Sequence, residues 1–506
     1  MRPLVVLVVG LALPGLLPAL AAAGWSAVVV FLAPVTGALM AAVAVAIELG
    51  LGGSLVPDYL AVAATVNIAV IAWWVTAPRV GGARPRNAPA PPTLGAWAWS
   101  VLGVAVVAAC LAAVPLRSLR VALLTGDGNP IWLTHALLVY GGHHEMLTSL
   151  QNPAYVISNP DYPPLVSAAT ALAFKFYGLG NLHLSVQMTV LVTACALGVV
   201  AMGIVAVSDV AAAGSGACWP ARVVAVAAAG VIGVVGFAVS GGFAIEGYAD
   251  LVWAAFAVGA VLWGLVLPRS PRALAVAWIC AAAASLTKNE GLTTALIILA
   301  AIALRYRPLS LPGPKARLWA ERAVFVLVPA LPGLAYAGII RLIGVHDAFF
   351  NAGSPESRLT RAGATVAGMA KYLHVAGPLA LGVLLVGCWF LRADRQRAGL
   401  ANPAWLWICC LGSLAIIFCT YVFGDLEIHG WLANSVNRTT IFAQLLLYTE
   451  VAIWAVMAAR GVFSRAPAEP PPVSEPLPEV LDDPRPASPA LPSRLSAARD
   501  AARPSR

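Results

Sequence analysis

The side chains best able to do chemistry in this sequence are charged residues that stand close to the ends of long apolar runs. Asp127 lies in the segment GDGNPIW, Lys288 in TKNEGL and Arg438 in WLANSVNR. A carboxylate can accept a proton from a hydroxyl group. A guanidinium can grip a phosphate through two parallel hydrogen bonds, and a lysine supplies a second positive charge.

Three further carboxylates accompany these residues. Glu246 and Asp250 lie four positions apart in EGYADL, so on a single helix they would share one face. Glu290 follows Lys288 by two positions. Each group also has a purely structural interpretation. Acidic residues near helix starts are commonly caps, the Lys and Glu of TKNEGL can pair with each other in a tight turn, and Arg438 can contact lipid headgroups.

A run of two histidines and a glutamate, His143 to Glu145, has the residue types of a metal site. Adjacent loop histidines are more often solvated, so we predict no metal site from it. The eight cysteines lie in or beside apolar runs, and no Cys-x-x-Cys pair is present. We therefore interpret the cysteines as apolar residues of helices and not as disulfides or metal ligands.

The elements that carry these residues are predicted to be membrane helices. The chain has 506 residues, of which 60% are hydrophobic and 10% charged, and its mean hydropathy is +0.85. Soluble domains average about 25% charged residues, so a water-soluble enzyme and a disordered protein are both excluded. We expect an all-α polytopic membrane protein with about 13 spans of roughly 20 residues. The apolar runs lie at 3–23, 27–49, 59–77, 96–115, 183–208, 222–239, 249–267, 272–286, 291–305, 322–344, 375–392, 403–423 and 440–459.

The loops between these runs alternate in charge. Basic residues collect in every second loop, at Arg79, Arg84, Arg86, Arg269, Arg272, Arg305, Arg307, Lys315, Arg317, Arg322, Arg392, Arg395, Arg397, Arg460 and Arg465. By the positive-inside rule these loops are cytoplasmic. All the candidate residues above then face outward, as do the histidines. The formal net charge of +9 is explained by orientation and by contact with anionic lipids, so no nucleic-acid partner is expected.

The longest outward segment, about 116–182, is expected to hold two helices at the membrane surface. Asn129 and Pro130 fit the cap and first position of a short helix over 130–140. Pro163 and Pro164 fit the start of a second helix over 164–178. Between them stand Asp161 and Tyr162, in the turn DYPPL.

An Asp just beyond a span, a large outer loop with surface helices, and a D-Y-P-P-L turn together resemble the C-type glycosyltransferase superfamily. The similarity is strongest to its bacterial branch, with the protein O-mannosyltransferases and the aminoarabinose and galacturonic acid transferases of lipid A. Three further segments also match this superfamily in their order along the chain and in their common predicted side of the membrane: EGYADL, TKNEGL and WLANSVNR. The resemblance covers roughly 96–460. It leaves 1–95 as an accessory membrane segment and 465–506 as a Pro-rich tail, expected to be disordered and cytoplasmic.

The resemblance implies an inverting transfer of a sugar from a polyprenyl-phosphate donor to an extracytoplasmic hydroxyl of a glycan, lipid or protein. Asp127 would be the general base, and Arg438 and Lys288 would stabilise the leaving phosphate. The family's acidic motif is often a carboxylate pair, whereas here Gly128 follows Asp127. The expected substrate-binding residues are Asp161, Tyr162, Glu246, Asp250, Glu290 and Trp431.

No organic cofactor is implied, and a divalent cation held by Glu246 and Asp250 stays open. The residue bias toward Ala, Val, Arg and Pro is typical of GC-rich bacterial genomes, so we expect a bacterial plasma-membrane protein. A transporter or flippase is the main alternative. Transporters commonly bind substrate near the bilayer midplane within inverted repeats. This chain instead collects its ionisable groups toward one face and shows no such repeat. A non-catalytic scaffold would not need this set of residues.

Overall fold

The computed structural model describes residues 2–76, 94–118, 126–212, 219–240, 243–305, 315–345, 356–373, 395, 400 and 402–463. These residues are 87% helical and contain no strand, so the expected all-α class is confirmed. The expected tail at 465–506, the expected span at 375–392, and His346, Asp347 and His374 lie outside the described residues.

Eight helices in the described part of the chain are long and apolar enough to cross a membrane. They coincide with eight of the expected spans, and the total of about 13 stays a prediction. The eight are α1, η1 and α2 in series (Arg2–Val5, Val6–Ala12, Leu13–Ala23), α3 (Val29–Leu51), α4 (Leu55–Thr76), α9 (Leu184–Ala212), α10 (Trp219–Val239), α14 (Lys315–Leu342), α17 (Ala404–Phe423), and α18 with α19 in series (Ile428–Thr439, Ile441–Phe463).

Four more expected spans are present as helices that fall short of that criterion. They are α5 (Leu94–Ser118), α11 with η6 in series (Asp250–Val261, Leu262–Val266), α12 (Pro271–Ser285) and α13 (Asn289–Arg305). Every residue of α11 is buried. α12 and α13 form a tight hairpin, since only residues 286–288 separate them. A Cβ atom on Gly291 would lie 2.1 Å from the carbonyl oxygen of Ala284, so glycine permits this close approach.

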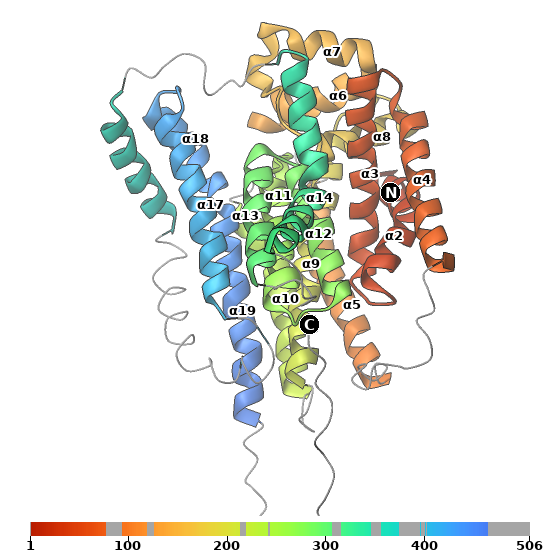
Figure 1. Cartoon of the computed structure of the whole chain (residues 1–506), viewed down its shortest axis with the longest axis vertical. Coiled ribbons are helices and arrows are strands. Elements are labelled where there is room, and N and C mark those ends of the chain that lie inside the picture. Colours follow the sequence, from red (N-terminus) through yellow and green to blue (C-terminus); the bar gives the residue numbers. More distant parts are fainter. Residues whose placement is uncertain are drawn as a thin grey trace, which may run out of the picture. The chain divides into compact units, whose positions relative to one another are not determined.

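The N-terminal helices pack through small residues, as membrane helices commonly do. A Cβ atom on Gly15 would lie 2.1 Å from the carbonyl oxygen of Ala33, and one on Gly37 would lie 2.1 Å from that of Leu11. Thr36 Oγ1 donates to the Gly15 carbonyl at 2.7 Å. α3 also contacts α8, α9, α12 and α14, so this region packs directly on the rest of the bundle (Figure 1).

Where it is described, the outer segment folds into six short helical elements, more than the two helices expected. They are η2 (Gly126–Gly128), η3 (Asn129–Leu133), α6 (Thr134–Gly141), α7 (His143–Gln151), η4 (Pro153–Ser158) and α8 (Leu165–Tyr177). Two details differ from the prediction. Gly128, and not Asn129, occupies the N-cap position of η3, with no side-chain cap. α8 is buried from Leu165 to Phe174 because α3, α6 and α9 cover it, so it is not simply a surface helix.

The two C-terminal helices α18 and α19 descend beside α17 (Figure 1), and together they include the 33-residue candidate span Ile428–Arg460. At 1.5 Å per residue this stretch is about 50 Å long, which exceeds the hydrocarbon thickness of about 30 Å. Part of it must therefore lie outside the apolar layer. α18 carries the polar residues of IHGWLANSVNRT, whereas α19 is largely apolar, so α18 is the part that fits a polar environment.

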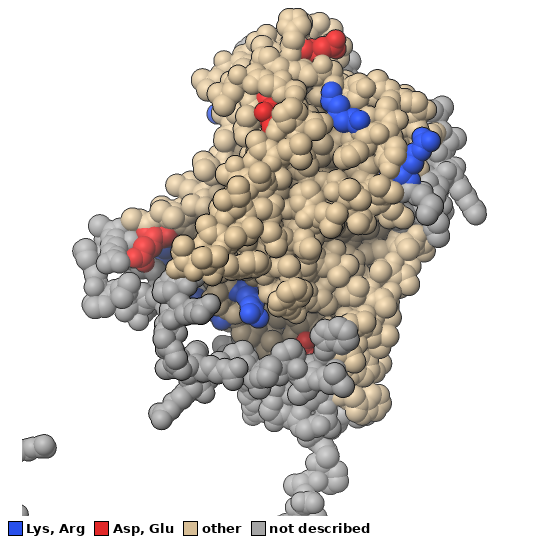
Figure 2. All heavy atoms as spheres, turned by 90° about the vertical axis from the view of Figure 1, so that its right-hand side faces the viewer, with Lys and Arg blue, Asp and Glu red and all other residues tan. Residues whose placement is uncertain are grey.

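One face of the molecule shows the surface expected of a membrane protein. In Figure 2 the charged side chains are sparse, and most of the surface between them is uncharged. Lipid-facing helices need such a surface because a charge at the bilayer centre costs several kcal/mol.

Candidate functional site

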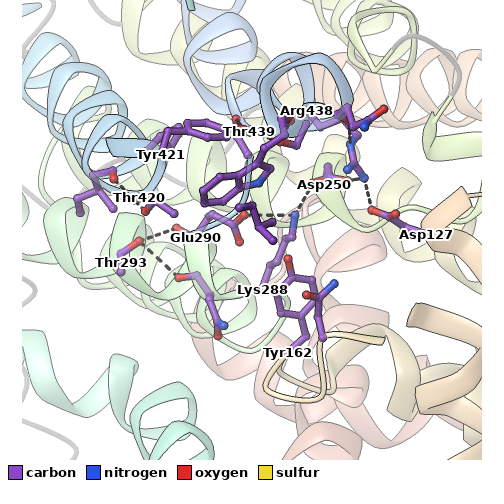
Figure 3. A pocket seen from close by; sticks show the side chains of 18 of the residues that line it. Asp127, Tyr162, Asp250, Lys288, Glu290, Thr293, Thr420, Tyr421, Arg438 and Thr439 are labelled. Atoms are coloured by element: carbon purple, nitrogen blue, oxygen red, sulfur yellow. Dashed lines mark hydrogen bonds and ion pairs between the residues drawn. The ribbon is translucent and has the colours of Figure 1, made fainter. Parts of the chain in front are cut away.

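A cavity of about 860 Å³ collects most of the charged residues that the sequence singled out (Figure 3). Its walls come from η2, the segment after η4, the start of α11, the α12–α13 turn, the end of α17 and one face of α18. The lining residues that bear on chemistry are Asp127, Tyr162, Asp250, Lys288, Glu290, Tyr421, Trp431 and Arg438. Segments more than 300 positions apart in the sequence therefore meet in one site.

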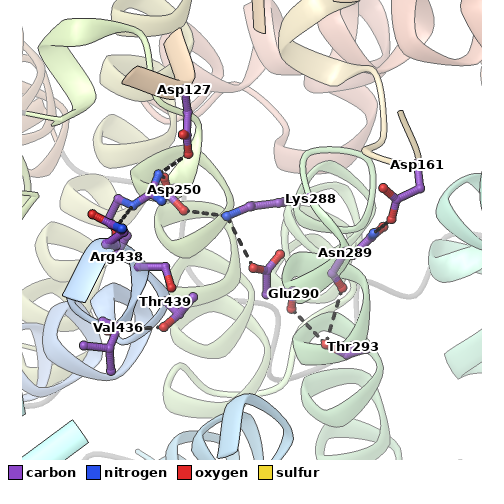
Figure 4. Close-up of polar contacts among 12 residues, drawn as sticks. Asp127, Asp161, Asp250, Lys288, Asn289, Glu290, Thr293, Val436, Arg438 and Thr439 are labelled. Atoms are coloured by element: carbon purple, nitrogen blue, oxygen red, sulfur yellow. Dashed lines mark hydrogen bonds and ion pairs between the residues drawn. The ribbon is translucent and has the colours of Figure 1, made fainter. Parts of the chain in front are cut away.

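A chain of alternating charges crosses this cavity (Figure 4). Arg438 Nη1 donates a hydrogen bond to Asp127 Oδ2 and lies 3.4 Å from Asp250 Oδ2. Lys288 Nζ donates to Asp250 Oδ1 at 2.7 Å and lies 3.3 Å from Glu290 Oε1. Asp250 thus contacts both cations, one with each carboxylate oxygen, and holds them on the same side of the cavity.

The members of this chain differ in burial. The side chain of Asp250 is 3% exposed, whereas that of Asp127 is 33% exposed. A buried charge is tolerated only when it is paired and hydrogen-bonded. Asp250 has two cationic partners, so it fits the role of a fixed counter-ion. Asp127 is the most exposed of the three carboxylates in this chain of charges, ahead of Glu290 at 21%.

Lys288 stays protonated in this setting. Burial by itself lowers the pKa of its ammonium group, but the carboxylates of Asp250 and Glu290 outweigh burial and raise that pKa well above its usual value. The Tyr162 ring also lies 5.3 Å from Lys288 Nζ and supports the positive charge. Burial raises the pKa of the Tyr162 phenol, so this group stays neutral.

The D-Y-P-P-L turn fixes the position of the α12–α13 turn. Asn289 Nδ2 donates to Asp161 Oδ2, and the backbone N–H of Leu165 donates to the Leu286 carbonyl at 2.8 Å. Tyr162 in turn stacks on Trp132 of η3, with ring centroids 5.7 Å apart. These contacts set where Lys288 sits, so Asp161 supports the site from outside the cavity.

One stripe of α18 packs it against α17. Ile428, Leu432 and Val436 recur every four residues and form a small apolar cluster with Ile417 and Tyr421. This spacing places the three side chains on one face of the helix.

A second stripe of α18 faces the cavity. Gly430, Trp431, Asn434, Ser435 and Arg438 line it. Trp431 packs edge-on against Tyr421, with ring centroids 4.7 Å apart. The sequence WLANSVNR therefore supplies a cation and an aromatic ring to the same wall.

A buried arginine that no sequence pattern singled out fixes the α17–α18 turn. Arg361 lies on the helix over 358–373, and its Nη2 donates to the Tyr421 carbonyl at 2.6 Å. Its Nη1 donates to the Leu426 carbonyl at 2.8 Å and to Glu356 Oε2 at 2.9 Å. No local pattern pointed to this residue, because its backbone partners belong to a turn about 60 positions further along the chain.

Most of the predicted site residues meet in the cavity, and two do not line it among the described residues, Asp161 and Glu246. Glu246 ends the short helix η5 (Phe243–Glu246), and Asp250 begins α11. Gly247, with φ of 94°, breaks the helical path between them. The expectation that Glu246 and Asp250 share one helix face is therefore wrong.

No group of three His, Cys, Asp or Glu residues in the described part of the chain is arranged to hold a metal ion. In the His143–Glu145 run, His143 Nδ1 lies 2.7 Å from the Glu48 carbonyl oxygen and joins α7 to α3. No protein-family model, curated protein or solved structure matches this chain.

Proposed function

We propose that the chain is a membrane glycosyltransferase that moves a sugar from a polyprenyl-phosphate donor to an acceptor hydroxyl with inversion. The observation that carries this proposal is the meeting of Asp127, Lys288 and Arg438 in one cavity. A carboxylate able to accept a proton lies beside two cations able to stabilise a leaving phosphate. The cavity volume of about 860 Å³ is within the range of small-molecule sites.

The proposed reaction is a single displacement. The acceptor oxygen attacks the anomeric carbon while Asp127 accepts the hydroxyl proton. The bond between the anomeric carbon and the phosphate oxygen breaks, and its electron pair leaves on the phosphate. Arg438 and Lys288 stabilise the charge that develops there. The products are the glycosylated acceptor, polyprenyl phosphate and a protonated Asp127, which then loses its proton to water.

The remaining walls fit the other parts of such substrates. Ile416, Ile417 and Leu426 give one side of the cavity an apolar surface suited to a lipid-linked molecule. Trp431 presents an aromatic ring on which a sugar can stack. We further propose that the cavity faces the extracytoplasmic side of a bacterial plasma membrane, because basic loops lie at the other ends of the helices.

The direct test is a transfer assay with purified full-length protein in lipid bilayers. A panel of radiolabelled polyprenyl-phosphate sugars is supplied with an extract of envelope acceptors. Label from at least one donor should pass to an acceptor, and Arg438→Gln should slow transfer by about 100- to 1,000-fold. Asp209→Asn is the matched control. Asp209 Oδ1 lies 3.5 Å from Arg222 Nε, and neither residue lines the cavity. The substitution should therefore leave transfer unchanged.

Two outcomes would contradict the proposal. In one, no donor of the panel loses its sugar. In the other, labelled donor crosses the bilayer intact, which would favour the transporter or flippase alternative.

A further inference from the structure

In the cavity as it stands, carboxylates engage both cations. Arg438 Nη1 contacts Asp127 and Asp250, and Lys288 contacts Asp250 and Glu290. Three carboxylates therefore outnumber two cations. A phosphate that enters this site brings more negative charge to a partly buried place, where like charges repel strongly. Its binding is favoured if one carboxylate moves away.

The three carboxylates are not equally free to move. Asp250 is 3% exposed, contacts both cations and begins a helix whose every residue is buried. Glu290 contacts Lys288 but not Arg438 in the described structure. Asp127 is 33% exposed, and its ion pair with Arg438 joins it to the opposite wall. Asp127 is thus the carboxylate that can leave Arg438 with the least rearrangement.

Arg438 itself has enough other contacts to stay in place. Its Nε donates to the Asn434 carbonyl at 3.1 Å. Its guanidinium lies 5.0 Å from the centre of the Tyr248 ring and 5.7 Å from that of Phe243. With Asp250 on one side and this aromatic pair on the other, the guanidinium keeps its position when Asp127 departs.

We propose that a donor phosphate replaces Asp127 on Arg438, and that Asp250 positions both cations throughout. This inference rests on the proposed function and adds an order of events to it. Before the donor binds, Asp127 Oδ2 accepts an N–H bond from Arg438. After the exchange, that oxygen is available to the acceptor hydroxyl, so the base is released only when the leaving group is in place.

The exchange makes an unusual prediction, because removal of the proposed base should improve donor binding. Binding of radiolabelled farnesyl phosphate to the full-length protein in lipid nanodiscs is measured by equilibrium dialysis. Asp127→Asn should bind this probe at least about tenfold more tightly than the wild type, since a competitor for Arg438 is gone. Asp127→Ala should do the same, and Arg438→Gln should lose most of the binding.

The matched control is Glu427→Gln, which removes a carboxylate from the same cavity without touching Arg438. Glu427 lines the cavity and caps the start of α18. Its removal should change binding by no more than about twofold, because the Gln carbonyl oxygen can still accept a cap hydrogen bond at the start of α18 and Arg438 loses no partner. An equal gain for Glu427→Gln and Asp127→Asn would overturn the exchange.

The remaining outcomes separate this inference from the proposed function. If the wild type binds farnesyl phosphate and Asp127→Asn binds it equally or more weakly, the exchange is wrong while the phosphate site stands. If neither protein binds the probe, both the exchange and the proposed function are contradicted.

Discussion

At the scale of single residues, the site depends on one buried carboxylate more than on the exposed one. Asp250 contacts Lys288 and Arg438, whereas Asp127 contacts Arg438 alone among these cations. Removing one member of a buried ion pair leaves an uncompensated charge and typically costs about 3–5 kcal/mol. A pair with an exposed member contributes about 1 kcal/mol or less.

We therefore predict that Asp250→Asn destabilises the protein far more than Asp127→Asn. The measurement is the thermal unfolding of each variant in detergent, compared with wild type. Asp250→Asn should lower the apparent unfolding temperature clearly, because Lys288 and Arg438 then repel each other with less compensation. Equal temperatures for the two variants would show that Asp250 is not the fixed counter-ion.

Sequence reasoning reached these residues but not their pairing. Asp127 and Arg438 are 311 positions apart, and only their shared sidedness indicated that they could meet. Spacing could not show that a glycine break separates Glu246 from Asp250, or that Asp250 is buried between cations. Those features depend on the packing of α11, the α12–α13 turn and α18, which no local pattern encodes.

At the scale of elements, the α12–α13 hairpin determines where Lys288 and Glu290 lie. Gly291 lets the start of α13 approach Ala284 so closely that any side chain there would collide with a backbone carbonyl. Hydropathy located both helices as short apolar runs with one brief polar turn between them.

We predict that Gly291→Ala reduces sugar transfer markedly, since α13 must move and take Glu290 and the neighbouring Lys288 with it. Initial rates in the transfer assay are the readout. Gly338→Ala on α14 is the matched control, because a Cβ atom there has open space within 4 Å. Equal activity of the two variants would mean that the hairpin does not position the cations.

The outer helix α6 should make the fold sensitive to acid. Burial lowers the pKa of His135 to about 4, although the nearby Ser158 backbone partly offsets this effect. The unfolded chain, with a histidine pKa of about 6.5, binds more protons between these pH values. The stabilisation by neutral His135 is therefore complete above pH 6.5 and is lost as pH falls toward 4.

His135→Leu should accordingly shift the midpoint of acid unfolding to lower pH. Unfolding is followed by tryptophan fluorescence between pH 7 and 4. His144→Gln, a change at an exposed neighbour on α7, should leave the midpoint unaltered. If His135→Leu unfolds at the same pH midpoint as the wild type, His135 is not a cause of the acid sensitivity.

At the scale of the whole molecule, the proposed transfer reaction requires that the cavity open on the side opposite the basic loops. The positions of eight spans followed from hydropathy alone, because the bilayer demands about 20 apolar residues per crossing. Short helices buried inside the bundle, such as α11 and α12, are harder to count because they need not match the membrane thickness.

The sidedness predicts that a peptide tag inserted between α13 and α14 is protected in intact cells. A tag inserted just before residue 356 should be accessible to an added protease. Permeabilised cells, in which both tags become accessible, provide the control. The reverse pattern would place the cavity on the cytoplasmic side and overturn the proposed orientation.

The central claim, that Asp127 accepts the proton of the attacking hydroxyl, is tested most directly by single-turnover sugar transfer. Wild type, Asp127→Asn and Asp209→Asn are compared in lipid bilayers with a saturating labelled donor. We predict that Asp127→Asn stays folded and inserted but transfers at least about 100-fold more slowly, whereas Asp209→Asn matches the wild type. Near wild-type transfer by Asp127→Asn would contradict the account.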